Sequence, residues 1–334
     1  MFLIEADNVN DAYYSALALI DTEGFTDESR NGLVLKFPGP LVTKYQFSHE
    51  RVLFDAARDA NPFLHLFEAM WMLSGSNDAQ WIGQFGPNLL NFSDDGKTLH
   101  GAYGHRWREH FKVDQITGAI DELIRDPRSR RVVISMWDPY IDPPVAAAGG
   151  KDVPCNTQIY LNVRPDNTLS MTVCNRSNDL IWGLYGANAV HMSILHEYIA
   201  LAVGIPMGDL VTISNDAHVY EKHFPLIKNT KPLDNPYQLL FSSLNTEPLW
   251  NRGGMMKETR ADFDADVRKF IADPFQLENN FNTQYFRQTV SRMARTWSLH
   301  KSKMRESALA MADQIEAEDW KKAVKEWLGR RYAS

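Results

Sequence analysis

The chain has 334 residues, 44% hydrophobic and 23% charged, and its formal net charge is −7 because 42 Asp and Glu outnumber 35 Lys and Arg. This composition is ordinary for a soluble globular protein, and the negative balance argues against nucleic acid as the main ligand. No apolar run approaches the ~20 residues that span a bilayer, and no basic segment of a secretory signal opens the chain. With two cysteines and no zinc-like Cys/His spacing, we expect a cytoplasmic protein without a metal ion.

Hydrophobic periodicity predicts the secondary structure in chain order. We expect a helix at 9–20, a strand at 32–37, helices at 60–75 and 116–126, strands at 130–137, 157–164 and 168–176, a helix at 187–204, a strand at 209–220 and a helix at 308–331. Small residues and glycines at 143–152 predict a flexible insert. Because most strands are neighbours in sequence and no repeat or linker divides the chain, we expect one α+β domain over residues 1–334.

Cys155 lies behind a proline at the start of a predicted strand, in KDVPCNTQIY. A catalytic thiolate needs a group that lowers its pKa or takes its proton. Two arginine-bearing stretches, at 129–131 and 175–179, could supply positive potential and grip a phosphate with forked donors. Taken singly, each arginine would more often form a surface ion pair, and the cysteine would more often be a small buried hydrophobe.

The order of the motifs along the chain favours a functional role for Cys155 and the arginines over these ordinary alternatives. EAMWMLSG, AYGHRWR, DPRSRRVV, VPCN, NRSNDLIWGL and NDAHVYEKH follow one another along the chain. Together they resemble the ordered motifs of the thymidylate synthase family over residues 28–223, whereas residues 235–334 diverge and form a partly helical C-terminal extension. The resemblance implies the thymidylate synthase-like fold, with helices on a mixed β-sheet whose other face forms a homodimer interface. It also implies transfer of a one-carbon unit from 5,10-methylenetetrahydrofolate to a pyrimidine nucleoside monophosphate.

The resemblance also assigns roles to residues. The catalytic set would be Cys155, which adds to carbon 6 of the base, Glu68, which relays protons, and Tyr103, which lies near carbon 5. Arg30, Arg176 and Ser177 would hold the phosphate, Arg130 and Arg131 would reach it from the partner subunit, and His218 and Tyr220 would bind the sugar 3′-hydroxyl. Asn188 and Asn156 would face the base, while Asp179, Trp182 and Gly183 would bind the folate pterin.

Each assignment has an ordinary structural alternative. Glu68 could be a solvated helix residue, and Tyr103, His218 and Tyr220 could serve packing alone. Cys174 is expected to be a core thiol. His191 and His196 lie on the long apolar helix, where we expect satisfied core histidines rather than ligands.

Departures from the family pattern bear on the base and the product. Asn156 replaces the family's histidine after the nucleophile, and the base-reading asparagine falls at Asn188 only if its segment carries one inserted residue. A buried amide can pair with either base. Because of Asn156, we predict dCMP as the substrate slightly in preference to dUMP. The hydroxyl group of Ser177 fits a deoxynucleotide.

The product depends on water in the site. The chain ends EWLGRRYAS, unlike the family's apolar closing tail, and residues 88–96 lack the family's folate-facing tryptophan. A wet site favours water over hydride as the final nucleophile, so we predict a hydroxymethyltransferase, of the kind found in phages. The alternatives are a divergent thymidylate synthase that makes dTMP from dUMP and a catalytically silent nucleotide- or RNA-binding homologue.

Overall fold

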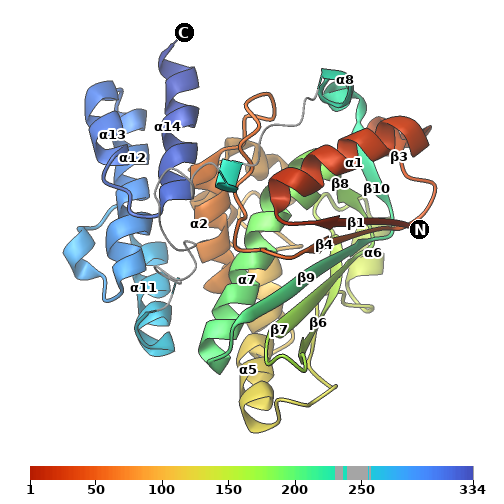
Figure 1. The fold of residues 1–334 in the computed structure, drawn as a ribbon, viewed down its shortest axis with the longest axis horizontal. Helices are drawn as coiled ribbons and strands as arrows, with labels where there is room; N and C mark the ends of the chain where they lie inside the picture. The colour runs from red at the N-terminus through yellow and green to blue at the C-terminus, as the bar shows by residue number, and fades with distance from the viewer. Residues whose placement is uncertain (230–235, 239–254, 256, 334) are drawn as a thin grey trace.

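The computed structural model describes residues 1–229, 236–238, 255 and 257–333, and its centre is a six-stranded sheet (Figure 1). The strands lie in the order β1 (Phe2–Ala6), β4 (Leu41–Tyr45), β9 (Met207–Ser214), β7 (Leu169–Asn175), β6 (Asn156–Val163) and β5 (Val133–Ser135). The pairs β1/β4 and β7/β9 are parallel and the other pairs are antiparallel. The predicted mixed sheet of an α+β fold is therefore confirmed.

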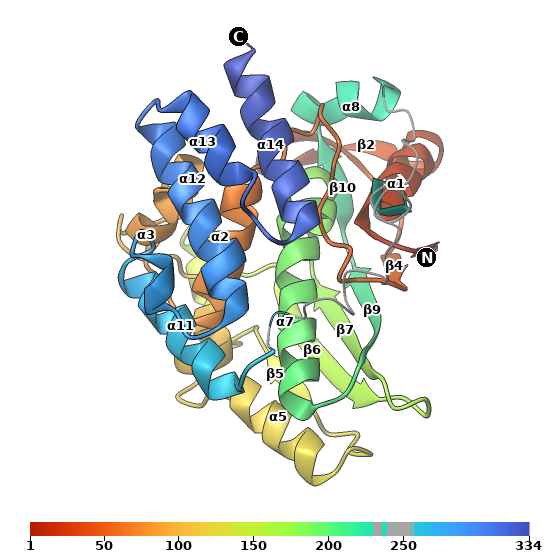
Figure 2. The same ribbon diagram turned by 60° about the vertical axis from the view of Figure 1, so that its left-hand side comes forward.

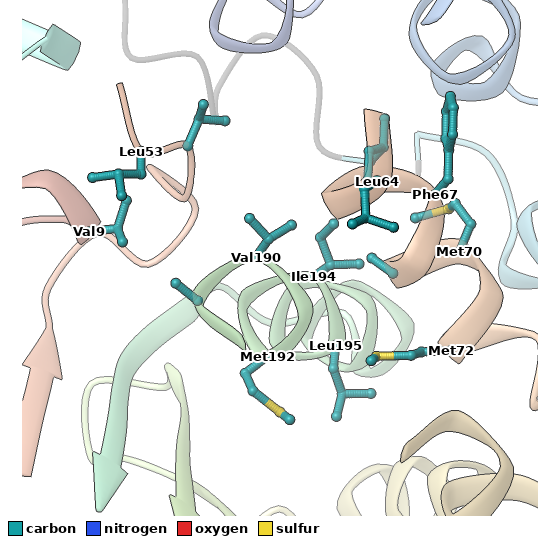
Figure 3. Packing of buried hydrophobic residues seen from close by; sticks show 14 of the residues in the cluster. Val9, Leu53, Leu64, Phe67, Met70, Met72, Val190, Met192, Ile194 and Leu195 are labelled. Carbon is teal, nitrogen blue, oxygen red and sulfur yellow. The ribbon is translucent and has the colours of Figure 1, made fainter. Parts of the chain in front are cut away.

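One face of this sheet is covered by helices. Helix α1 (Val9–Glu23) packs on β1 and β4, α7 (Asn188–Val203) on β7 and β9, and α5 (Gln115–Arg125) on β5 and β6. Helix α2 (Pro62–Leu73) lies against α7, and Figure 3 shows apolar side chains of the two helices facing each other. Asn61 caps α2, because its side chain accepts hydrogen bonds from the main-chain N–H groups of Phe63 and Leu64.

A second, four-stranded sheet holds the order β2 (Phe25–Ser29), β3 (Gly32–Lys36), β10 (Ala217–Tyr220) and β8 (Asn178–Asp179). Strand β10 pairs antiparallel with β3 and parallel with β8. This sheet brings together segments that are almost 190 residues apart in the chain, from Gly32 to Tyr220.

Four further helices, α11 (Arg260–Ala272), α12 (Ser291–Lys301), α13 (Arg305–Ala312) and α14 (Glu318–Tyr332), form a C-terminal helical layer (Figures 1 and 2). Helices α11, α12 and α14 contact α2. The ring of Phe63 lies 5.2 Å from that of Trp297 and 5.5 Å from that of Trp327, and Phe67 lies 5.2 Å from Phe270. Helix α2 is thus enclosed between α7 and this layer.

Shorter helices complete the described chain. They are α3 (Ala79–Gly83), α4 (Tyr103–His105), α6 (Asp142–Ala147) and α8 (Phe224–Asn229), the 3₁₀ turns Pro87–Phe92, Glu221–His223 and Glu278–Asn280, and the π turns Arg106–His110, Leu180–Ala187 and Phe286–Val290. Within the residues that the structure describes, no helix is both long enough and apolar enough to cross a membrane.

Three predicted elements were wrong in detail. The expected strand at 209–220 is two strands in different sheets, because the chain turns at Asn215 and Asp216, whose main chains bond to Asn175 and Asn178. The expected helix at 308–331 is split between α13 and α14 by a turn at 313–317. The expected flexible insert at 143–152 begins as helix α6, anchored where fully buried Asp142 accepts two hydrogen bonds from Arg106, at 2.7 and 2.9 Å.

The other face of the six-stranded sheet carries no described helix, and we call it the open sheet face. Register aligns two rows of side chains across it: Leu3, Val42, Ile213, Cys174, Gln158 and Ser135, and Glu5, Lys44, Val211, Thr172, Tyr160 and Val133. Leu3, Val133 and Tyr160 are 58%, 41% and 42% exposed. Cys174 is only partly buried here, so the prediction of a core thiol was wrong.

Candidate active site

The loop before β6 presents Cys155 and is fastened by Arg176. The main-chain N–H of Arg176 donates to the carbonyl of Cys155 at 2.9 Å, and its Nε and Nη2 donate to the carbonyls of Pro154 and Val153, each at 2.9 Å. Arg30 reaches the same loop, since its Nη1 lies 3.4 Å from the carbonyl of Gly150. Burial raises the pKa of the Cys155 thiol, while Arg176 and Arg30 act to lower it.

Tyr103 lies beside this thiol. Burial raises the pKa of its hydroxyl most, Cys155 raises it further, and the main chain of Asn156 lowers it. The position depends on Gly104, because a Cβ there would come within 1.9 Å of the carbonyl oxygen of Met72. Glycine therefore lets the start of α4 approach the end of α2, the helix that carries Glu68.

Glu68 is a buried carboxyl group with a strongly shifted pKa. Burial raises its pKa to about 8, and the charge of Asp152 adds to the shift. Oε2 of Glu68 lies 3.4 Å from Nε2 of His191 on α7. Burial lowers the pKa of His191 to about 3, so the imidazole is neutral and this contact is not an ion pair. His191 is buried, as expected of a core histidine, and its Nε2 contacts Glu68, although neither ring nitrogen makes a hydrogen bond of good geometry to the described residues.

Asp152, three residues before Cys155, was missed from the sequence. Its Oδ2 accepts a hydrogen bond from the main-chain N–H of Gly101 at 2.8 Å, two residues before Tyr103. The charge of Asp152 raises the pKa values of Glu68, Tyr103 and Cys155. An acidic residue so close to a candidate nucleophile was the only signal that the sequence offered.

The second sheet places two predicted sugar-binding residues side by side. His218 and Tyr220 are two residues apart on β10, and their rings meet edge to face with centroids 5.0 Å apart. Nδ2 of Asn31 donates to the Tyr220 hydroxyl at 3.4 Å. His218 is also in register with Asp179 of β8, so this sheet joins the predicted sugar and folate residues.

Asp179 lies on β8, next to β10, and Trp182 lies in the π turn that follows β8. Asp179 caps the π turn Leu180–Ala187 by accepting from the N–H groups of Ile181 at 3.0 Å and Trp182 at 3.2 Å. Trp182 is 44% exposed and its Nε1 donates to Nε2 of His223 at 3.0 Å. Gly183 is required by close packing, because a Cβ there would lie 2.6 Å from Oδ1 of Asn178.

Arg58 is a second residue missed from the sequence. It is only 7% exposed, its guanidinium lies 4.4 Å from the centroid of the Trp182 ring, and its Nε donates to the carbonyl of Ile181 at 2.7 Å. Its Nη2 is buried without a hydrogen-bond partner among the described residues. A single arginine far from the recognised motifs gave no signal in the sequence.

The two candidate base-reading amides lie at different depths of the site. Asn156 is fully buried, its Nδ2 donates to the carbonyl of Cys174 at 2.9 Å, and its Oδ1 has no partner among the described side chains and main-chain groups. Asn188 begins α7 and its Nδ2 donates to Oδ1 of Asn178 at 3.1 Å. The π turn Leu180–Ala187 runs directly into α7 at Asn188, and Gly186 within it has non-helical dihedral angles.

Three predicted site residues, Ser177, Arg130 and Arg131, make no side-chain hydrogen bond to the other predicted site residues within the described chain. Ser177 is partly buried and follows Arg176 without a side-chain hydrogen bond in the described part of the molecule. Arg130 and Arg131 are exposed and precede β5, which runs antiparallel to β6 and pairs with it from Tyr160 back to Gln158, so the two arginines lie on the side of this pairing away from Cys155. They line a surface hollow together with Asp126, Arg128 and Ser129.

Among the residues that the structure describes, no three His, Cys, Asp or Glu side chains group as metal ligands. The described site therefore contains a cysteine, carboxylic acids, a tyrosine, arginines and amides. These groups can perform nucleophilic and proton-transfer chemistry on an anionic substrate.

The chain belongs to the thymidylate synthase family, whose model, described as thymidylate synthase, matches residues 11–244. It is 40% identical to a deoxyuridylate hydroxymethyltransferase of Pseudomonas phage M6, in an alignment that covers 100% of this chain and 95% of that protein. It is 34% identical to a deoxyuridylate hydroxymethyltransferase of Delftia phage PhiW-14, over 66% of this chain and 62% of that one.

Among solved structures, thymidylate synthase from T4 phage matches with a TM-score of 0.55 and 23% identity, covering 66% of this chain and 82% of that chain. This match shows the fold. The family and the enzyme class, a one-carbon group transferase, are confirmed as predicted.

Proposed function

We propose that the protein transfers a hydroxymethyl group to carbon 5 of dUMP, using 5,10-methylenetetrahydrofolate and water. The observation that carries this proposal is the convergence of Cys155, Glu68 and Tyr103 around a loop fastened by Arg176. The phage relatives are named for deoxyuridylate, which favours dUMP over the dCMP suggested by Asn156.

Cys155 would add to carbon 6 of the base and make carbon 5 nucleophilic. Burial keeps this group a thiol in the resting protein, so the attack needs the positive charge of Arg176 and loss of the thiol proton. Glu68, with a pKa of about 8, holds a proton at neutral pH and can donate it to a base carbonyl as charge develops. Tyr103, beside the thiol, is placed to act where the proton of carbon 5 leaves.

The phosphate would be bound by Arg30, Arg176 and Ser177 at the mouth of the Cys155 loop. His218 and Tyr220 would bind the sugar, and Asn188 and Asn156 the base. The buried, unpartnered Oδ1 of Asn156 is available to a ligand donor, and rotation of the amide would present Nδ2 to an acceptor.

The folate would supply the one-carbon unit. The residues present fit it, because exposed Trp182 offers an aromatic face beside Asp179 and Gly183. Arg58 beneath that tryptophan has a buried, unpartnered Nη2 suited to an anionic group of the same ligand.

We also propose a homodimer formed through the open sheet face. Half-exposed apolar side chains on that face would be buried by a second copy, Cys174 among them. Arg130 and Arg131 lie far along β5 and β6 from the Cys155 of their own chain. Two-fold pairing would let each subunit lend these arginines to the phosphate of its partner.

Product analysis tests the function. Purified protein is incubated with methylenetetrahydrofolate and dUMP, dCMP or CMP, and the products are identified by mass spectrometry while near-ultraviolet absorbance follows dihydrofolate. We expect hydroxymethyl-dUMP without dihydrofolate. Formation of dTMP with dihydrofolate would establish the reductive alternative, and failure to release tritium from carbon 5 of labelled dUMP would support a silent binding protein.

A further inference from the structure

Asp152 is a further carboxyl group beside Cys155, and its charge acts on Glu68, Tyr103 and Cys155. It lies on the loop of Cys155 and is tied to the segment of Tyr103 by the 2.8 Å hydrogen bond from the N–H of Gly101 to Oδ2. Within the described chain Asp152 forms no ion pair, and Oδ1 receives no hydrogen bond. The Arg106 guanidinium and the His100 ring, which act to lower the pKa of Asp152, are both bonded to Asp142.

Burial raises the pKa of both Asp152 and Glu68, and the charge of Asp152 acts on Glu68, so the two carboxylates resist simultaneous ionisation. Burial and the charge of Asp152 both raise the pKa of Glu68, with no compensating donor. Burial and the charge of Asp94 raise the pKa of Asp152, whereas the Gly101 N–H, His100 and Arg106 act to lower it. Glu68, whose pKa is raised to about 8, holds its proton at neutral pH, whereas the donors around Asp152 favour its ionised form.

Hydroxymethylation has a requirement that a reductive synthase lacks. Once carbon 5 has received the one-carbon unit and the folate has departed, the Cys155-bound nucleotide carries an exocyclic methylene. Water is a weak nucleophile and attacks this carbon efficiently only if a base removes its proton. Glu68 in its protonated form cannot accept that proton.

We propose that Asp152 is a further catalytic residue, the general base that activates the attacking water. This inference rests on the proposed hydroxymethyl transfer. A water O–H proton passes to the Asp152 carboxylate while the oxygen bonds to the methylene carbon. The electron pair of the exocyclic double bond moves into the ring as an enolate. It then re-forms the 5,6 double bond and expels the Cys155 thiolate.

The test separates two stages of one turnover. Release of tritium from carbon 5 of dUMP reports every step up to the methylene, whereas hydroxymethyl-dUMP reports the water step. With Asp152→Asn we expect product to fall about 100-fold relative to tritium release, since general bases contribute roughly 10²–10⁴-fold. An added thiol, already partly ionised, should trap the accumulated methylene as a thioether.

Asp166→Asn is the control for loss of a carboxylate, because exposed Asp166 bonds to Thr168 in the turn between β6 and β7, at the end of β6 away from Cys155. It should leave the ratio of product to tritium release unchanged. Asp152→Ser provides a second variant should the amide disturb folding, and dUMP binding by calorimetry verifies an intact site in both.

An unchanged product ratio in the Asp152 variants would overturn the proposal. So would equal losses of tritium release and product, because Asp152 would then act before the methylene forms. The wild-type product is scored separately: if it is dTMP, the proposed function fails and no water step remains for Asp152.

Discussion

Replacing Glu68 with Gln should stabilise the protein while it impairs catalysis. The folded protein holds the pKa of Glu68 at about 8, against an ordinary value of 4.5. Between these values the folded state binds more protons at this site than the unfolded chain does. The stability of the wild type therefore falls as pH rises from 4.5 through 8, whereas a neutral Gln carries no such pH-dependent cost.

The size of this pH-dependent cost in stability follows from the same two pKa values, 4.5 and about 8. Each pKa unit is worth about 1.4 kcal/mol, so the wild type should carry a cost of about 3 kcal/mol at pH 7 and of less than about 1 kcal/mol at pH 5. The side chain of Glu68 is only 13% exposed, so solvent screens this cost little.

Urea unfolding of wild type and Glu68→Gln from pH 5 to 8.5, at one protein concentration, measures the difference in the free energy of unfolding. Glu326→Gln, on the surface of α14 and paired with Lys322, serves as the control for loss of a carboxylate. A gap between wild type and Glu68→Gln that stays constant across pH, or a more stable wild type at pH 7, would show that Glu68 is not held protonated by burial.

Three further outcomes are expected. Cys155→Ser should abolish tritium release while analytical ultracentrifugation still finds a dimer, whereas Cys174→Ser should remain active. Turnover by Cys155→Ser would contradict covalent catalysis by Cys155. Arg176→Ala should weaken dUMP binding by roughly 2–4 kcal/mol in calorimetry, and it should also lower kcat because Arg176 holds the Cys155 loop. Unchanged affinity for dUMP would contradict the binding of the phosphate by Arg176. Mixing Cys155→Ser with an Arg130→Ala/Arg131→Ala double variant should restore about a quarter of wild-type activity through heterodimers with one intact site, and no recovery would argue against shared sites.

The sequence predicted the fold through periodicity and ordered motifs. The strands at 157–164 and 168–176 and the helices at 9–20 and 187–204 correspond closely to β6, β7, α1 and α7. The two strands alternate apolar and polar residues, whereas 187–204 is a long segment that is apolar on most sides. The break at 215–216 was invisible, since the strand pattern continues while the chain passes from one sheet to the other. That residues 1–334 form one domain stays a prediction.

Site residues were predicted where a motif contains them. Cys155, Tyr103 and Arg176 belong to quoted segments, and the structure gathers them around one loop. Asp152 and Arg58 were missed because burial and unpartnered atoms, which single them out, are properties of the folded chain. The roles of all these residues remain proposals until the variants are measured.

The C-terminal helical layer determines which kind of residue α2, the helix that bears Glu68, carries on one of its sides. Phe63 and Phe67 carry aromatic rings on the side of α2 turned toward α11, α12 and α14, where an uncovered helix would carry charges. Relatives that possess the extra layer should therefore be distinguishable from shorter ones by aromatic residues one and five places before the position of Glu68. Evolutionary gain or loss of this layer would have to change those two positions at the same time.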